Sequence, residues 1–213
     1  MKPSSTTPES QTGPKPKSRL RENVEAIVLA VILALFIRTF VVQAFKIPSG
    51  SMEDTLLIGD HILVNKFIYG IRMPFTNQTV VPVAEPERGD IVVFKFPQDP
   101  KMDFIKRVVG IPGDTVECRN KVVYVNGAPE ENTHAVHKDA FILRGNPRDN
   151  FGPIKVPADS LFVMGDNRDR SNDSRFWNFV SYSELRGKAF MIYWSWNKDD
   201  FAVRWRRIGD MIE

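Results

Sequence analysis

The segment Asp103-Phe104-Ile105-Lys106-Arg107-Val108-Val109-Gly110 indicates the class of fold most clearly. It is rich in Val, Ile and Phe, and because successive side chains of a strand point to opposite faces, Phe104 and Val108 would lie on one face. Short runs rich in Val, Ile and Phe recur downstream of residue 60, and Gly-Asp or Asn-Gly turn signals separate them. The sequence therefore predicts a mainly β fold, an antiparallel sheet or barrel-like domain. The expected strands are 61–67, 91–96, 104–109, 115–118, 122–125, 161–164 and 190–194.

Lys106 is the unusual residue of this segment. The alternation places it on the same face as Phe104 and Val108. Burial disfavours an ammonium group and can lower a lysine pKa by up to about 3 to 5 units, which leaves an amine that can accept a proton. Lys106 is therefore a candidate general base. The alternative is a surface strand on which Lys106 and Arg107 are both solvated.

A candidate nucleophile lies upstream, in Ile47-Pro48-Ser49-Gly50-Ser51-Met52. Serine catalysis needs an exposed hydroxyl on a rigid turn, a base within hydrogen-bond reach and donors for the oxyanion. Pro48 restricts the backbone and Gly50 can adopt a positive φ, so Ser51 could project from a constrained loop. Taken alone, the motif also fits an ordinary solvated turn.

A polar block, residues 165–177, directly follows the expected strand 161–164. Short polar side chains of this kind fix loop geometry through bonds to the backbone, so a purely structural turn is one interpretation. Asp166, Asp169 and Asp173 suggest a calcium loop, but the glycine and terminal glutamate of an EF-hand are missing. We expect no metal site here.

The histidines offer no comparable arrangement. His61 opens an expected strand, and His134 and His137 lie in residues 128–160, a proline-containing range of little periodicity that we expect to be an irregular insertion. A Gly-x-Ser-x-Gly nucleophile elbow is absent from the sequence. A Ser-His-Asp triad is therefore disfavoured.

Composition argues against two further properties, nucleic-acid binding and an internal disulfide. The net charge is only +3, with basic and acidic residues evenly mixed, which argues against a nucleic-acid-binding surface. Cys118 is the single cysteine, so an internal disulfide cannot form.

A short helix is expected near residues 180–185, with Ser181 or Ser183 as its cap.

The N-terminal part predicts a tail followed by a membrane anchor. Residues 1–23 are rich in Pro, Ser, Thr and Lys, so we expect a disordered cytoplasmic tail. Residues 26–45 are largely apolar and match the roughly 20 residues that cross about 30 Å of hydrocarbon, provided that Arg38 lies inside the span and snorkels to the interface. A buried core helix, or a cleaved secretory signal ending at Val42-Gln43-Ala44, would use the same residues.

Arg38 interrupts the apolar core that a secretory signal needs, which favours an uncleaved transmembrane helix over residues 24–45. Cations outnumber acids before the span, so the positive-inside rule keeps the N-terminus cytoplasmic. Residues 46–213 would then form a β-rich catalytic domain on the other side of the membrane.

Taken together, these segments resemble bacterial type I signal peptidase, the Ser-Lys protease that removes signal peptides from exported proteins. The resemblance rests on the order and spacing of several segments and on the apolar span directly before the serine. The segments are 47–57, Gly59-Asp60 with the strand after it, 88–94, 103–114, 165–177 and 203–209.

The resemblance implies a role for each matching position. Ser51 would be the nucleophile and Lys106 the base. The Ser49 hydroxyl and the backbone N–H of Ser51 would hold the oxyanion, and Ser171 would orient Lys106. No cofactor or metal is implied.

Further positions would hold the loop and the substrate. Asp173 and Arg175 would pair to hold the polar block. Shallow apolar pockets would accept the small side chains at positions −1 and −3 of a signal peptide and reject larger ones, which suits Ala-x-Ala recognition. The residues expected to line these pockets are Ile47, Met52, Leu56, Phe104 and Ile105.

The implied location is the outer face of the bacterial cytoplasmic membrane, with Trp194, Trp196 and Trp205 resting on lipid. Signal peptides of exported preproteins would be the substrates. Two alternatives are a Ser-Lys protease with a narrower client, such as a pilin precursor, and a non-enzymatic, membrane-tethered β-domain that binds peptides.

Two residues depart from the family pattern. Asp54 stands where proline is common, and it would add a carboxylate near Ser51 that we expect to pair with Lys106, keep it protonated and raise the pH optimum. Asn178 stands where glycine is usual, and Asn tolerates a positive φ better than other residues.

Overall fold

The computed structural model describes residues 19–36, 41–72, 79–81 and 83–213. The chain divides into two compact units, Met1–Ile37 and Arg38–Glu213. The predicted disordered tail covers residues 1–23, of which residues 1–18 lie outside the described residues, as does Arg38. The prediction is wrong for residues 19–23, because they form the start of a helix.

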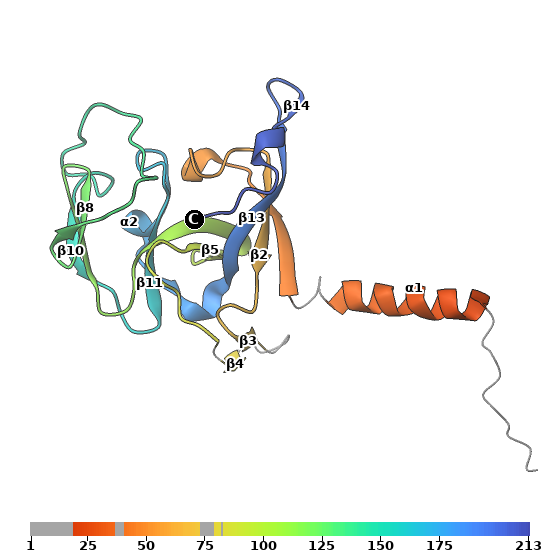
Figure 1. Ribbon diagram of the computed structural model, residues 1–213. Coiled ribbons are helices and arrows are strands. Elements are labelled where there is room, and N and C mark those ends of the chain that lie inside the picture. Colours follow the sequence, from red (N-terminus) through yellow and green to blue (C-terminus); the bar gives the residue numbers. More distant parts are fainter. Residues whose placement is uncertain (1–18, 37–40, 73–78, 82) are drawn as a thin grey trace, which may run out of the picture. The chain divides into compact units, whose positions relative to one another are not determined.

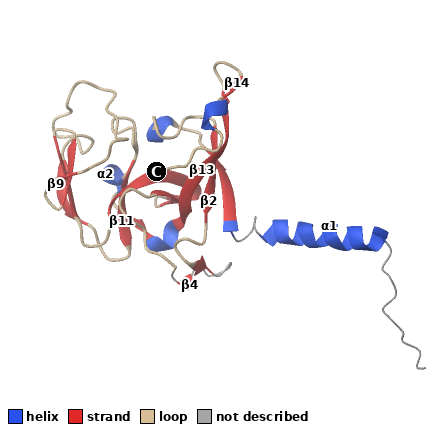
Figure 2. Cartoon of the chain, in the orientation of Figure 1, coloured by secondary structure: helices blue, strands red, loops and turns tan. Residues whose placement is uncertain are grey.

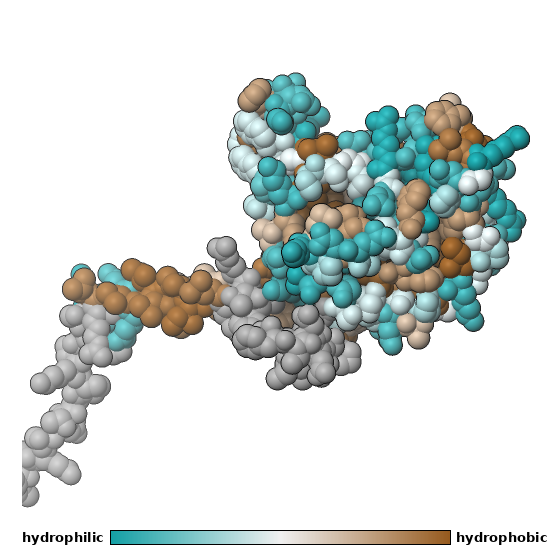
Figure 3. Space-filling model, turned by 180° about the vertical axis from the view of Figure 1, so that it is seen from behind, coloured by the Kyte–Doolittle hydropathy of each residue, from teal (hydrophilic) through white to brown (hydrophobic). Residues whose placement is uncertain are grey.

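Helix α1, Arg19–Phe36, is the described element of the first unit. It starts with charged residues and continues as an apolar run whose side chains are exposed, and these form a nearly continuous apolar surface along the helix (Figure 3). Among the residues described, none of the helices is both long and apolar enough to cross a membrane.

The anchor predicted over residues 24–45 extends too far toward the C-terminus. Val42–Lys46 forms strand β1, which pairs antiparallel with β2, Asp60–Asn65. The β-branched and aromatic side chains of this stretch suit a sheet once a partner strand is present, and apolar composition alone cannot distinguish the two states.

The second unit is mainly antiparallel β, as predicted (Figures 1 and 2). Its large sheet has the order β1-β2-β13-β5-β6-β11-β12, and β14 pairs with β13. The remaining strands of this sheet are β5 (Ile91–Phe96), β6 (Asp99–Gly110), β11 (Ser160–Met164), β12 (Val180–Ser181), β13 (Leu185–Asn197) and β14 (Ala202–Val203).

A four-stranded sheet of order β10-β7-β8-β9 and a β3-β4 pair complete the unit. The four-stranded sheet corrects the prediction that residues 128–160 are irregular throughout, because β9 and β10 lie within this range. β10 is an edge strand, where a Gly-Pro step is tolerated. The strands are β3 (Ile71–Arg72), β4 (Thr79–Val81), β7 (Thr115–Arg119), β8 (Val122–Val125), β9 (Ala128–Pro129) and β10 (Phe151–Lys155).

The helix expected near residues 180–185 is instead β12 followed by a 3₁₀ turn, Tyr182–Glu184. The predicted cap is correct, since the Ser181 hydroxyl accepts from the backbone N–H of Ser183. A short helix missed by the sequence, α2 (Ser174–Trp177), lies in the polar block. Asn178 ends it at φ 71°, the positive φ expected of that position.

The cores of the unit follow the alternation of its strands. In β2, buried and half-buried residues alternate along the whole strand, and Ile62 and Val64 point into a cluster shared with β5 and β13. β5 is buried almost throughout, because both of its faces are covered. The chemistry-bearing loops are therefore anchored on a rigid sheet.

Candidate active site

Ser51 is presented by a short 3₁₀ turn, Gly50–Met52, that follows β1. Ser51 is half-buried, and Met52, next to it, is completely buried in the core and fixes the turn. Gly50 does not have the positive φ allowed for by the sequence. The direction of the Ser51 hydroxyl is therefore set by the 3₁₀ turn and not by a positive φ at Gly50.

Lys106 lies in the middle of β6, opposite Val92 of β5. It is 3% exposed, so the solvated alternative is wrong. Its neighbour Arg107 is also buried, and the guanidinium binds the carboxylate of Asp166 through two hydrogen bonds of 2.8 and 2.9 Å. The two cations point away from each other, as alternation along a strand requires.

The structure brings Ser51 and Lys106 together. The Lys106 Nζ donates to Ser51 Oγ at 2.8 Å and to the carbonyl of Ile105 at 2.8 Å. Burial lowers the pKa of Lys106 to about 8, against the opposing effect of Asp173 and Asp166. A buried amine with this pKa exchanges its proton near neutral pH and lies within reach of a hydroxyl, so the pair can perform general-base chemistry.

Gly165 brings the polar block against the Ser51 turn. A Cβ at this position would lie 2.3 Å from the Ser51 carbonyl oxygen and 2.3 Å from Ser171 Oγ, so a larger residue would displace backbone. The backbone N–H of Asn167 donates to the Ser51 carbonyl at 3.2 Å, and Asn167 Nδ2 donates to the Gly50 carbonyl at 3.1 Å. The nucleophile turn is thus tied to the polar block.

Ser171 is buried within this block, and its hydroxyl has no hydrogen-bond partner of ordinary geometry among the described residues. It lies close enough to Asp173 to help lower the pKa of that carboxyl. No hydrogen bond joins Ser171 to Lys106 within the described part of the chain, so its orienting role stays a prediction.

Asp173 and Arg175 form the ion pair expected of them. Arg175 Nε and Nη2 each lie 2.8 Å from the Asp173 carboxylate, and both side chains are buried. Burial acts to raise the pKa of Asp173, but the hydrogen bonds and charge of Arg175 outweigh it and lower the pKa. Asp173 also caps α2 and accepts from the backbone N–H of Gly165.

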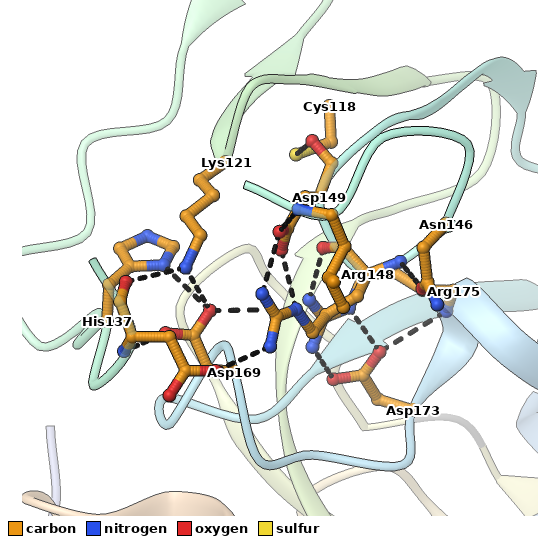
Figure 4. A network of polar contacts seen from close by, with 11 residues as sticks. Cys118, Lys121, His137, Asn146, Arg148, Asp149, Asp169, Asp173 and Arg175 are labelled. Atoms are coloured by element: carbon orange, nitrogen blue, oxygen red, sulfur yellow. Dashed lines mark hydrogen bonds and ion pairs between the residues drawn. The ribbon is translucent and has the colours of Figure 1, made fainter. Parts of the chain in front are cut away.

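A wider charge network supports this pair from residues 139–149 (Figure 4). Arg175 Nη1 donates to the Arg148 carbonyl at 2.7 Å, and the Arg148 guanidinium binds Asp149 and Asp139. Lys121 Nζ lies 2.7 Å from Asp169. Residues 139–149, which lie in the range expected to be irregular, therefore help to hold the polar block in place.

The carboxylates that suggested calcium are all engaged by cations. Asp166 binds Arg107, Asp169 binds Lys121, and Asp173 binds Arg175. Among the described residues, no group of three or more His, Cys, Asp or Glu side chains is arranged to hold a metal. None of the three histidines, all of them described, lines the cavity at Ser51.

A cavity of about 490 Å³ opens over Ser51 and Lys106. Ser49, Phe104 and Ile105 line it as predicted. The other predicted pocket residues, Ile47, Met52 and Leu56, are at most 2% exposed and belong to the core beneath the turn, so they do not line the cavity. The remaining lining residues are Pro48, Gly50, Glu53, Ile58, Asp103, Asn167, Arg170 and Asn172.

Asp54 does not pair with Lys106. Its carboxylate is largely exposed and lies 3.2 Å from Lys138 Nζ, in the range 128–160. The charges that act on Lys106 are those of Asp173, Asp166 and Arg175. The expected coupling of Asp54 to the base is therefore wrong.

Comparison with known proteins gives a consistent result. The sequence model of the family described as signal peptidase, peptidase S26, matches residues 20–194. A signal peptidase I from Pseudomonas fluorescens is 42% identical, and the match covers 79% of this chain and 70% of the relative. A signal peptidase I from Leptolyngbya laminosa is 39% identical, and the match covers 92% of each chain.

A crystal structure of a signal peptidase I from Enterococcus faecalis is 32% identical and covers 49% of this chain and 97% of its own, with a TM-score of 0.41. The family match and the identities to the two curated relatives carry the assignment. The chain belongs to the signal peptidase family, peptidase S26, and is a serine endopeptidase of the signal peptidase I type.

Proposed function

We propose that the protein is a membrane-bound signal peptidase that cleaves exported preproteins after Ala-x-Ala, with Ser51 as nucleophile and Lys106 as general base. The observation that carries the proposal is the 2.8 Å contact between Lys106 Nζ and Ser51 Oγ in an environment that lowers the lysine pKa to about 8. A lysine with its ordinary pKa near 10.4 would be almost fully protonated at neutral pH and could not accept the serine proton.

In the first half-reaction, neutral Lys106 takes the proton of Ser51 as Oγ attacks the carbonyl carbon of the scissile bond. The protonated lysine then gives this proton to the departing amine, which becomes the N-terminus of the mature protein. At pH 7 about one lysine in ten is neutral when the pKa is about 8. In the second half-reaction, Lys106 activates a water molecule that hydrolyses the acyl-enzyme.

The oxyanion of each tetrahedral intermediate needs donors at the turn. The Ser49 hydroxyl and the Ser51 backbone N–H are the proposed donors, and Ser49 lines the same cavity as Ser51. Asp173 and Arg175 are proposed to hold the polar block. Ser171 is proposed to orient Lys106 in the reacting complex, where catalytic hydrogen bonds tighten relative to the free enzyme.

Selectivity for small side chains is assigned to the apolar part of the cavity wall. Phe104 and Ile105 supply this surface from β6, and Ile58 also lines the cavity. Phe104 is held by a stacked contact with Phe96, with ring centroids 4.2 Å apart, so this wall cannot easily yield to a larger side chain. The three core residues beneath the turn act by fixing its position.

The membrane assignment has two parts. An anchor over residues 24–41, ending before β1, with the N-terminus cytoplasmic, would place residues 42–213 at the outer face of the bacterial cytoplasmic membrane. Trp194, Trp196 and Trp205, which are 37%, 37% and 73% exposed, would rest on lipid. Residues 1–23 would remain a cytoplasmic tail.

Preprotein processing by single-site variants tests the catalytic assignment. Ser51→Ala and Lys106→Ala should each abolish cleavage of an exported preprotein by the full chain in detergent micelles. Lys101→Ala is the matched control, because Lys101 is an exposed lysine on the same strand, and it should keep the wild-type rate. Processing at the wild-type rate by either catalytic variant would show that the assignment is wrong.

The breadth of clients separates the proposed function from a dedicated protease. A panel of unrelated preproteins should be cleaved after small residues at positions −3 and −1. Cleavage of a single precursor class would instead identify a dedicated enzyme.

A further inference from the structure

The side chain of Asn167 is paired on one side only. Asn167 is 1% exposed, and Nδ2 donates to the Gly50 carbonyl at 3.1 Å. Its Oδ1 is buried and has no hydrogen-bond partner among the described residues. The orientation of the amide is fixed, because a flipped amide would bring Oδ1 against the Gly50 carbonyl, which can only accept.

A buried acceptor without a donor is unusual, since native proteins pair nearly all such groups. Asn167 lines the cavity that also contains Ser51 and Lys106, so a substrate bound in this cavity lies next to the residue. A polypeptide bound there in an extended conformation brings backbone N–H groups at regular intervals, whatever its sequence. This suits an enzyme whose substrates vary in sequence.

We infer that Asn167 Oδ1 accepts a hydrogen bond from a backbone N–H of the bound signal peptide or of the first residues of the mature chain. Asn167 is then a substrate-binding residue. Because its amide and backbone also hold the carbonyls of Gly50 and Ser51, the contact couples the substrate backbone to the nucleophile turn. The inference rests on the proposed function of this cavity.

Backbone esters in the substrate test the contact directly. A peptide substrate is prepared as a series in which one amide N–H at a time, other than that of the scissile bond, is replaced by an ester oxygen. For the wild-type full chain in detergent micelles, one ester position should lower kcat/KM by about 5- to 10-fold, as expected for one hydrogen bond. Asn167→Ala should cleave the all-amide peptide more slowly and show no further loss at that position.

Two variants separate substrate binding from loop support. Asn167→Asp keeps an acceptor oxygen but loses the Nδ2 donor to Gly50, so it should retain the ester penalty even where its rate falls. Gln98→Ala removes an exposed amide that does not line the cavity, and it should respond to the ester as wild type does. An equal ester response in wild type and Asn167→Ala at every position would overturn the inference, as would loss of the response in Gln98→Ala.

Binding in a Ser51→Ala background covers the case in which Asn167→Ala is inactive. Amide and ester peptides should differ in Kd by about 5- to 10-fold for Ser51→Ala and bind equally to the double variant. Equal binding of the two peptides by Ser51→Ala would overturn the inference. Failure of the proposed function appears separately, as processing by Ser51→Ala.

Discussion

Replacing Lys106 by Met should make the protein more stable while abolishing activity. The lysine is 3% exposed, and burial shifts its pKa from 10.5 to about 8. Each pKa unit corresponds to about 1.4 kcal/mol, so the unfolded chain holds this proton more tightly by about 3 kcal/mol. Met has a similar length and carries no charge, so Lys106→Met should raise the free energy of unfolding at pH 7 by about 2 to 3 kcal/mol.

The sign of the pH dependence follows from the same shift. The penalty is fully present below about pH 8, and it falls as the pH rises from about 8 toward 10.5, because the native state has then already released the proton. The stability advantage of Lys106→Met should therefore shrink by about 1 kcal/mol between pH 7 and pH 9.

Denaturant unfolding of the full chain in detergent micelles, followed by tryptophan fluorescence, measures this difference. All four tryptophans lie between residues 177 and 205, so the signal reports on the β unit alone. Lys101→Met is the control, and it should change stability by less than about 0.5 kcal/mol at either pH, since Lys101 is exposed. A difference between Lys106→Met and wild type that stays constant from pH 7 to pH 9 would refute the depressed pKa.

Two further predictions concern the loops around the pair. Asp54→Pro should leave the rising limb of the profile of kcat/KM against pH at an apparent pKa of about 8, because Asp54 pairs with Lys138 and not with the base. A shift of this apparent pKa by more than about half a unit would mean that Asp54 does act on Lys106. Asp173→Asn leaves Arg175 buried without its counter-charge, so it should destabilise the protein by about 3 to 5 kcal/mol, or roughly 10 °C in Tm. Arg119→Ala, which removes an exposed ion pair to Glu117, is the control, and an equal Tm for Asp173→Asn and wild type would contradict the reasoning.

Local sequence patterns predicted those strands in which an apolar run and a flanking turn signal agree. β5 has the predicted bounds, because Ile91–Phe96 is an apolar run, interrupted only by Lys95, that follows a Gly-Asp turn. β13 is longer than expected, Leu185–Asn197, since its first residues include Arg186, Gly187 and Lys188, and only the neighbouring strands β2 and β5 hold them extended. β10 was missed because a Gly-Pro step interrupts its pattern.

The Ser51–Lys106 pair could be predicted from the sequence, but the residues that surround it could not. Alternation placed Lys106 on an apolar face, which depends only on neighbours in the strand. The direction of Ile47, Met52 and Leu56 could not be read in the same way. Met52 lies in a 3₁₀ turn and the other two lie in the irregular backbone on either side of it, where no period of two separates core from cavity. The Lys138 partner of Asp54 lies 84 residues away and is set by tertiary packing alone.

Trapping of the acyl-enzyme tests the central claim most directly. The full chain in detergent micelles is mixed with a peptide ester that ends in Ala at the cleavage site, quenched in acid and digested for mass spectrometry. A covalent mechanism predicts an initial burst of about one product per enzyme and an acyl group that fragmentation places on Ser51 rather than Ser49. Lys106→Ala should show neither the burst nor the label. An acyl group on any residue other than Ser51 would contradict the assignment of the nucleophile.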